Sequence, residues 1–177
     1  MGSNPDLIYW DSCAFLHFLA GDHPLSAELQ LIYDDWLAGL VTMVTSTLTM
    51  AEVLYVKCGE PPQLQRADPT RRAEIEALFT PTPTRRLVLI ELSAITARKA
   101  RDLHWDLAIK PKDAVHVASA LEAHCEVMHT TDASLQSKSG QVGGSPILRI
   151  EAPVWGKQLD MGGLGAGIES PDDPTES

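Results

Sequence analysis

The segment KPKDAVHVASALEAHCEVMHTTD, residues 110–132, decides the fold class of this chain. Its first part is a run of small and apolar residues that begins at Pro111, and proline is tolerated in the first turn of a helix. Its second part, EVMHT at residues 126–130, is typical of a short buried strand. The segment therefore predicts a helix followed by a strand, with Asp113 in the first turn of the helix and Asp132 just beyond the strand.

The same alternation of helical and strand patterns runs through most of the chain. Strands are expected at residues 7–10, 41–45, 85–92, 126–130 and 146–150. Helices are expected at residues 12–21, 24–40, 46–59, 71–79 and 93–109, and again from residue 111. Because strands that alternate with helices form a mostly parallel sheet covered on both faces, we expect an α/β fold. Its central sheet should have four to five strands, flanked by helices.

The chain is expected to divide into one domain and a tail. Residues 60–70, EPPQLQRADPT, predict a proline-rich loop inside the domain. From Ala152 the sequence is rich in Gly, Pro, Ser and acidic residues, which bury too little apolar surface to offset the entropy of ordering. We therefore expect a domain over residues 1–151 and a disordered tail over residues 152–177, from which Trp155 could dock onto the domain.

Composition and cysteine spacing indicate the compartment. The chain has 177 residues, of which 44% are hydrophobic and 21% are charged, as in an ordinary globular protein. No apolar run approaches the roughly 18 residues of a membrane span, and the N-terminal residues lack the pattern of a secretory signal. The three cysteines form no C-x-x-C pair, which argues against a disulfide framework and a zinc site. We therefore expect a cytoplasmic protein with no membrane partner.

The net charge of −10 restricts how this chain could bind a nucleic acid. Residues 151–177 hold six acids and one base, so the tail carries half of that charge and the domain the other half. Because contacts with phosphates are electrostatic, an acidic protein is a poor general binder of nucleic acid. Any such role must work through a local site, with bound cations.

Polar residues follow three of the expected strands. Asp11 comes directly after the strand at residues 7–10, Ser46 after the second strand, and Asp132 after the strand at residues 126–130. The carboxyl ends of parallel strands meet at one edge of the sheet, where ligands bind in such folds. Asp113 should point toward the same edge, and so should Glu52, which shares a helical face with Leu48, Tyr55 and Val56.

Four carboxylates at one edge repel each other, and they stay ionised together only if a cation compensates them. Sets of oxygen ligands suit Mg²⁺ or Mn²⁺, ions that assist displacement at phosphorus. Taken singly, each acid has an ordinary alternative: Asp11 as a helix cap, Asp113 as a favourable charge at a helix start, Glu52 as an exposed helix acid and Asp132 as a turn residue. The four together favour a metal site.

Four stretches, in order, resemble the motifs of PIN-domain nucleases. They are IYWDSCAFL with Asp11, TSTLTMAEVLYV with Glu52, KPKDAVHVASAL with Asp113, and HTTDASL with Asp132. The resemblance covers roughly residues 7–150. It implies a PIN-like three-layer α/β sandwich and a Mg²⁺- or Mn²⁺-dependent endoribonuclease that cleaves single-stranded or structured RNA, leaving 5′-phosphate and 3′-hydroxyl ends. Members of this size are similar to VapC-type toxins, which dimerise and are blocked by an antitoxin, so we expect an RNA substrate, a homodimer and a cognate antitoxin.

Several roles remain open. Ser12, Ser46 and Thr131 could donate hydrogen bonds to the acids, although a helix cap explains Ser46 and a polar strand end explains Thr131 equally well. Structural roles are favoured for His116 and His129, because no carboxylate or cysteine forms a recognisable triad with either. Four basic residues could contact phosphates, although solvated surface charge is the favoured interpretation of each: Lys110, Lys112, Arg85 and Arg86.

Two other classes of function compete with a nuclease. A non-catalytic PIN module could serve as a protein-interaction subunit, and the acidic surface favours this alternative. The complete set of four acids counts against it, since a retired active site tends to lose its most repulsive groups. A phosphotransferase or phosphatase of another α/β family is disfavoured, because the chain has no D-x-D after the first strand and no glycine-rich phosphate loop.

Overall fold

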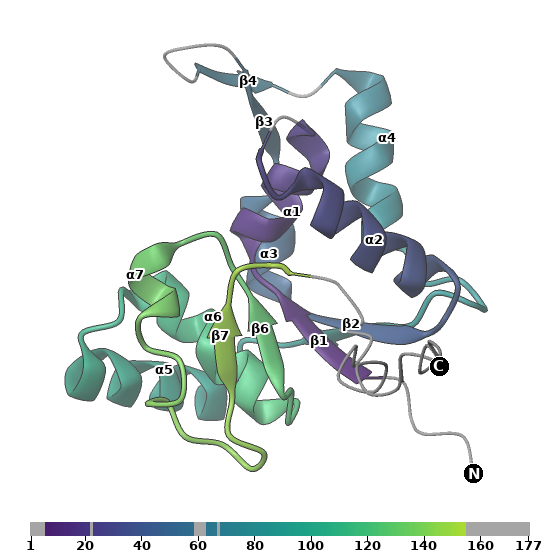
Figure 1. The fold of residues 1–177 in the computed structure, drawn as a ribbon. Coiled ribbons are helices and arrows are strands. Elements are labelled where there is room, and N and C mark those ends of the chain that lie inside the picture. Colours follow the sequence, from purple (N-terminus) through teal and green to yellow (C-terminus); the bar gives the residue numbers. More distant parts are fainter. Residues whose placement is uncertain (1–5, 22, 59–62, 67, 155–177) are drawn as a thin grey trace, which may run out of the picture.

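One parallel sheet forms the centre of the molecule (Figure 1). The computed structural model describes residues 6–21, 23–58, 63–66 and 68–154. Five strands form the sheet, and every neighbouring pair is parallel. In spatial order they are β5 (Leu87–Ile90), β2 (Val41–Ser46), β1 (Asp6–Trp10), β6 (Val127–His129) and β7 (Arg149–Glu151). The predicted α/β class is confirmed, and so is the mostly parallel sheet of four to five strands, which has five strands and is parallel throughout.

Helices cover both faces of this sheet. The described helices are α1 (Ser12–Ala20), α2 (Ser26–Leu37), α3 (Thr47–Glu52), α4 (Pro69–Leu78), α5 (Ala94–Leu107), α6 (Pro111–Glu122) and α7 (Ala133–Gln136). Ile8 and Trp10 of β1 pack into a core with α1, α2 and α4, while Tyr9 faces a second core with α5 and α6. Because successive side chains of a strand point to opposite faces, β1 serves both cores, and the arrangement has three layers.

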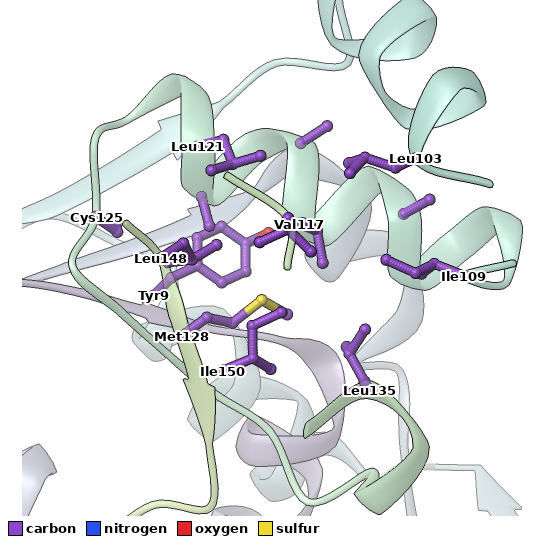
Figure 2. Packing of buried hydrophobic residues seen from close by; sticks show 14 of the residues in the cluster. Tyr9, Leu103, Ile109, Val117, Leu121, Cys125, Met128, Leu135, Leu148 and Ile150 are labelled. Atoms are coloured by element: carbon purple, nitrogen blue, oxygen red, sulfur yellow. The ribbon is translucent and has the colours of Figure 1, made fainter. Parts of the chain in front are cut away.

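The core beneath α6 fixes this helix against the sheet. Figure 2 shows Val117 and Leu121 of α6 packed over Tyr9, Met128 and Ile150 from three neighbouring strands. Tyr9 and Met128 are fully buried. A strand buried on both faces needs apolar residues at every position, which explains the unbroken LIYW run of β1. Because Asp113 lies in the first turn of α6, the packing of this helix also fixes the position of Asp113 relative to the sheet.

The helix predicted over residues 46–59 is wrong beyond Glu52. The helix ends there, and Val53 leaves the helical conformation with φ −85° and ψ 71°. The chain then forms β3 (Tyr55–Cys58), which pairs antiparallel with β4 (Gln63–Arg66) inside the predicted proline-rich loop. Full burial of Val53 in the core beside α1 outweighs the helical pattern, and the aromatic and β-branched residues after it favour a strand. Glu52 therefore does not share a helical face with Tyr55 or Val56.

Smaller differences concern element ends and one arginine. The short helix α7 was not predicted, and the last strand begins three residues later than expected. Arg85 is buried rather than a solvated surface charge: its guanidinium donates to the carbonyls of Ala77 and Thr80 and lies 4.9 Å from the ring centroid of Trp36. Trp155 and the rest of the predicted tail after Val154 lie outside the described residues, so the division at residue 151 stays a prediction. None of the helices in the described ranges is long and apolar enough to cross a membrane.

Candidate active site

Asp11 lies at the carboxyl end of β1, at the edge of the sheet where the strands lead into their helices. Its carboxylate accepts a hydrogen bond from the Ala14 N–H at 2.9 Å and so caps α1. The side chain is buried, and burial raises its pKa, to which the negative charge of Asp113 adds. The charge of His116 and the Thr130 hydroxyl oppose this rise without cancelling it. Asp11 is therefore a buried carboxylate without full electrostatic compensation.

Asp113 is the second acid with a raised pKa. It lies in the first turn of α6 and is half-buried. Burial is the main cause of the raised pKa, followed by the negative charges of Asp132 and then of Glu52. Lys110 and His116 act in the opposite direction. The carboxylates from four separate segments thus act on one another, as expected for a cluster at one edge of the sheet.

Glu52 differs from these two acids because donors surround it. Oε2 lies 2.8 Å from His116 Nε2, and Oε1 lies 3.1 Å from Lys112 Nζ. The hydrogen bond with His116 is the largest cause that lowers the pKa of Glu52 to about 2, and Lys112 and the Ser12 hydroxyl contribute to the same effect. The side chain is 14% exposed. Glu52 is therefore a firmly ionised carboxylate.

Asp132 caps α7 at the neighbouring strand end. Its carboxylate accepts from the backbone N–H of Ser134 at 2.8 Å and of Leu135 at 3.3 Å. Lys110 Nζ lies 3.5 Å from the other carboxylate oxygen. The Thr130 hydroxyl accepts from the Asp132 N–H at 3.1 Å and also hydrogen-bonds Asp11, so it connects the two acids.

The four acids offer an all-oxygen donor set of the kind that suits a hard divalent cation. Within the described ranges, no three His, Cys, Asp or Glu side chains form a ready-made metal site. Two ammonium groups, those of Lys110 and Lys112, instead lie against Asp132 and Glu52. Both lysine side chains are at least 70% exposed, so they are free to leave these acids. The residues present fit Mg²⁺ or Mn²⁺ chemically, since a cation would compensate Asp11 and Asp113, whose pKa values are raised.

Comparison with known protein families decides the classification. Residues 8–140, which include all four acids, match the family described as PIN domain. The chain belongs to the PIN domain family. PIN domains are typically nucleases that depend on metal ions, which agrees with the carboxylate edge of the sheet. A search of curated proteins gave no match.

Two of the solved structures that share the fold of this PIN domain are toxin structures of the VapC type. One is the Mycobacterium tuberculosis toxin VapC20, described as cleaving the Sarcin-Ricin loop, with a TM-score of 0.55 and 11% identity over 73% of this chain and 93% of the toxin. The other is VapBC2 from Rickettsia felis, bound to a DNA fragment from its promoter, with a TM-score of 0.55 and 15% identity over 82% of this chain and 98% of that chain. At such low identity the likeness shows the fold alone. It confirms the PIN-like architecture.

The residues expected to support the acids of this PIN domain differ in what they contact. The Ser12 hydroxyl hydrogen-bonds the Glu52 carboxylate. Ser46 caps α3 by accepting from the Leu48 N–H at 3.2 Å and donates to a backbone carbonyl of β5 at 3.4 Å. Thr131 hydrogen-bonds the His17 ring at 2.9 Å, whereas its neighbour Thr130 is the residue that contacts the acids.

The sequence favoured a structural role for His116, and the structure gives this histidine a contact with the acid cluster. The structure supplies the carboxylate partner whose absence favoured a structural role, because Glu52 approaches from a helix 64 residues away in sequence. The available signal was its place one helical turn after Asp113 on the same face. His129, in contrast, is buried within β6, and burial lowers its pKa to about 4, with Arg149 adding to the effect.

Proposed function

We propose that this PIN domain is a Mg²⁺- or Mn²⁺-dependent endoribonuclease that cleaves single-stranded or structured RNA and acts as the toxin of a toxin–antitoxin pair. The observation that carries the proposal is the gathering of Asp11, Glu52, Asp113 and Asp132 at the carboxyl edge of one parallel sheet, where they influence each other's ionisation. Ligands bind at this edge in α/β folds. Keeping Asp11 and Asp113 both ionised costs free energy unless a cation compensates them. The family, whose members are typically nucleases, supports the same chemistry.

Asp11 and Asp113 would be the principal ligands, because their ionised forms are the least compensated. Asp132 and Glu52 would complete the set as Lys110 and Lys112 move away. A bound divalent cation would supply Lewis acidity and positive charge to the phosphodiester. The released ammonium groups would lie at the rim of the site, within reach of the phosphates of an RNA strand, and would offset the negative charge of the domain there.

The proposed reaction is hydrolysis of a phosphodiester bond. Water adds to phosphorus, the P–O3′ bond breaks, and the products carry a 5′-phosphate and a 3′-hydroxyl. Backbone N–H groups would orient two of the ligands: the Ala14 N–H donates to Asp11, and the Ser134 N–H donates to Asp132. Such fixed groups lose little orientational freedom when the substrate binds.

The proposed partners are a cognate antitoxin and a second copy of this chain. The resemblance to VapC-type toxins implies both, and one of the solved structures that share the fold is VapBC2 on promoter DNA. Light scattering during size-exclusion chromatography tests the homodimer directly. A mass of one chain across micromolar concentrations would contradict it.

Cleavage of a labelled, mixed-sequence single-stranded RNA tests the activity. The purified chain is assayed with Mg²⁺, with Mn²⁺ and with EDTA, alongside Asp11→Asn and the matched control Asp106→Asn, which makes the same change on the exposed surface of α5. We expect metal-dependent cleavage that Asp11→Asn lowers by more than about a hundredfold, since even groups that only support metal ligands cost about 10–100-fold when removed. The control should keep full activity.

The same assay separates the alternative function. If the folded protein cleaves no RNA with either metal, the nuclease is refuted. The acidic surface would then favour a PIN module that serves as a protein-interaction subunit.

A further inference from the structure

A chain of hydrogen bonds runs from the core of the molecule to the acid cluster. The Tyr9 hydroxyl lies 2.9 Å from His116 Nδ1, and His116 Nε2 lies 2.8 Å from Glu52 Oε2. Tyr9 is fully buried in β1, and His116 is 2% exposed in α6. The two residues connect the centre of the sheet with a carboxylate at its edge, over three elements that are far apart in sequence.

The donor and acceptor roles along this chain follow from the groups themselves. A carboxylate can only accept, and His116 Nε2 lies 2.8 Å from Glu52 Oε2, so the hydrogen between them is on Nε2. In a neutral imidazole, Nδ1 then accepts from the Tyr9 hydroxyl, and in an imidazolium the Tyr9 oxygen accepts from Nδ1. Tyr9 satisfies either form because a phenol both donates and accepts. The bond from Nε2 to Glu52 is therefore kept both in the neutral ring with hydrogen on Nε2 and in the imidazolium.

Glu52 needs an external support because its own backbone restrains it little. It is the last residue of the six-residue helix α3, and Val53 after it is already non-helical. Its other ion-pair partner, Lys112, has a side chain that is 73% exposed, and exposed pairs of this kind hold a carboxylate weakly. The Ser12 hydroxyl, which also contacts Glu52, is only partly buried, so His116 is the most deeply buried of these three donors.

We propose that His116 is a positioning residue that fixes the Glu52 carboxylate relative to Asp113. Both His116 and Asp113 project from consecutive turns of α6, so one rigid helix sets the distance between the two acids. This inference rests on the proposed function, because it assigns His116 a role in the cation site of the nuclease. His116 touches neither the RNA nor the cation in this account; it acts through Glu52.

The test compares His116→Leu with His116→Gln. Leucine removes the donor and fills the site with an apolar side chain of similar size. The amide nitrogen of glutamine can instead occupy the place of Nε2 and donate to Glu52. Mn²⁺ affinity is measured by calorimetry without RNA, and kcat and KM are measured separately on RNA. We expect His116→Leu to lower Mn²⁺ affinity and kcat by about 10–100-fold with little change in KM, and His116→Gln to restore most of the loss.

A double-mutant cycle with Glu52→Gln tests whether His116 acts through Glu52. In the Glu52→Gln background, His116→Leu should cost nothing further, because the group that it positions is already gone. Equal penalties in both backgrounds would overturn the inference. So would wild-type Mn²⁺ affinity and kcat in His116→Leu while the wild-type chain is active.

A measurement on the wild-type chain covers the case in which His116→Leu does not fold. The NMR shifts of the His116 ring nitrogens, in EDTA, report which nitrogen carries hydrogen. Hydrogen on Nε2 supports the inference, and a neutral ring with hydrogen only on Nδ1 overturns it. If the wild-type chain binds no Mn²⁺ and cleaves no RNA, the proposed function fails, which these readings distinguish from a failure of the His116 role alone.

Discussion

Neutralising two acids of the same cluster should change the stability of the metal-free protein in opposite directions. Glu52 is held by donors, and its pKa falls from 4.5 to about 2 on folding, chiefly through the hydrogen bond with His116. At about 1.4 kcal/mol per pKa unit, this shift corresponds to about 3 kcal/mol of folding free energy. Because solvent reaches Glu52 and its partner Lys112 is exposed, screening weakens these interactions. We therefore expect Glu52→Gln to lower the free energy of unfolding by roughly 1–3 kcal/mol.

The sign with pH follows from the lowered pKa. A group whose pKa is lower in the folded state stabilises it above the unfolded pKa and loses that effect as pH falls through the folded pKa. The deficit of Glu52→Gln should therefore be complete above about pH 4.5 and should vanish toward pH 2.

Asp113 should behave in the opposite way. Burial and the charges of Asp132 and Glu52 raise its pKa, so its ionised form destabilises the folded protein. Asp113→Asn removes this penalty and should increase the free energy of unfolding near neutral pH in EDTA. The gain should shrink as the pH falls through the raised pKa, because the wild-type carboxyl is then protonated as well.

Urea unfolding in EDTA, followed by circular dichroism near neutral pH and in acid, measures both effects. Glu126→Gln and Asp106→Asn are the matched controls, since both side chains are exposed, and surface substitutions of this kind usually change stability by less than about 0.5 kcal/mol. If Glu52→Gln and Asp113→Asn change the free energy of unfolding in the same direction near neutral pH, this account is refuted. Glu52 would then not be the electrostatically compensated acid, or Asp113 not the uncompensated one.

Two further outcomes follow from the structure. Mg²⁺ at about a hundred times its Kd should stabilise the wild-type chain by about 2.7 kcal/mol and raise its Tm by roughly 5–11 °C, whereas Asp113→Asn should respond far less in the same thermal scan. Arg85→Met should lower the free energy of unfolding by at least about 2 kcal/mol, because the carbonyls of Ala77 and Thr80 lose their buried donor and the Trp36 ring loses its cation. RNA cleavage per folded molecule should not change. A loss of cleavage at full stability would contradict this structural role.

The sheet and three of its acids could be predicted from local patterns. Buried parallel strands leave unbroken apolar runs, so the position of Asp11 after LIYW and of Asp132 after EVMHT already placed both at one edge. Asp113 followed from the proline that begins its helix. These signals depend only on residues next to one another in sequence.

Other features depend on contacts between distant segments and could not be predicted. The end of α3 is set by burial of Val53 in a core built from other helices, so the helical pattern after Glu52 was misleading. The bond between His116 and Glu52 joins residues on two helices whose relative placement no local pattern encodes. Thr130, and not Thr131, contacts the acids, whereas Thr131 contacts His17. Successive side chains at a strand end point in opposite directions, so an error of one residue selects the wrong threonine.

The most direct test of the carboxylate edge as a metal-dependent nuclease site is the chemistry of the RNA ends after digestion. RNA cut by the wild-type chain in Mn²⁺ should carry 5′-phosphate and 3′-hydroxyl ends, with no cleavage in EDTA or by Asp113→Asn. Ends with a 2′,3′-cyclic phosphate, or cleavage that persists in EDTA and in Asp113→Asn, would show that the four acids are not the site of the reaction.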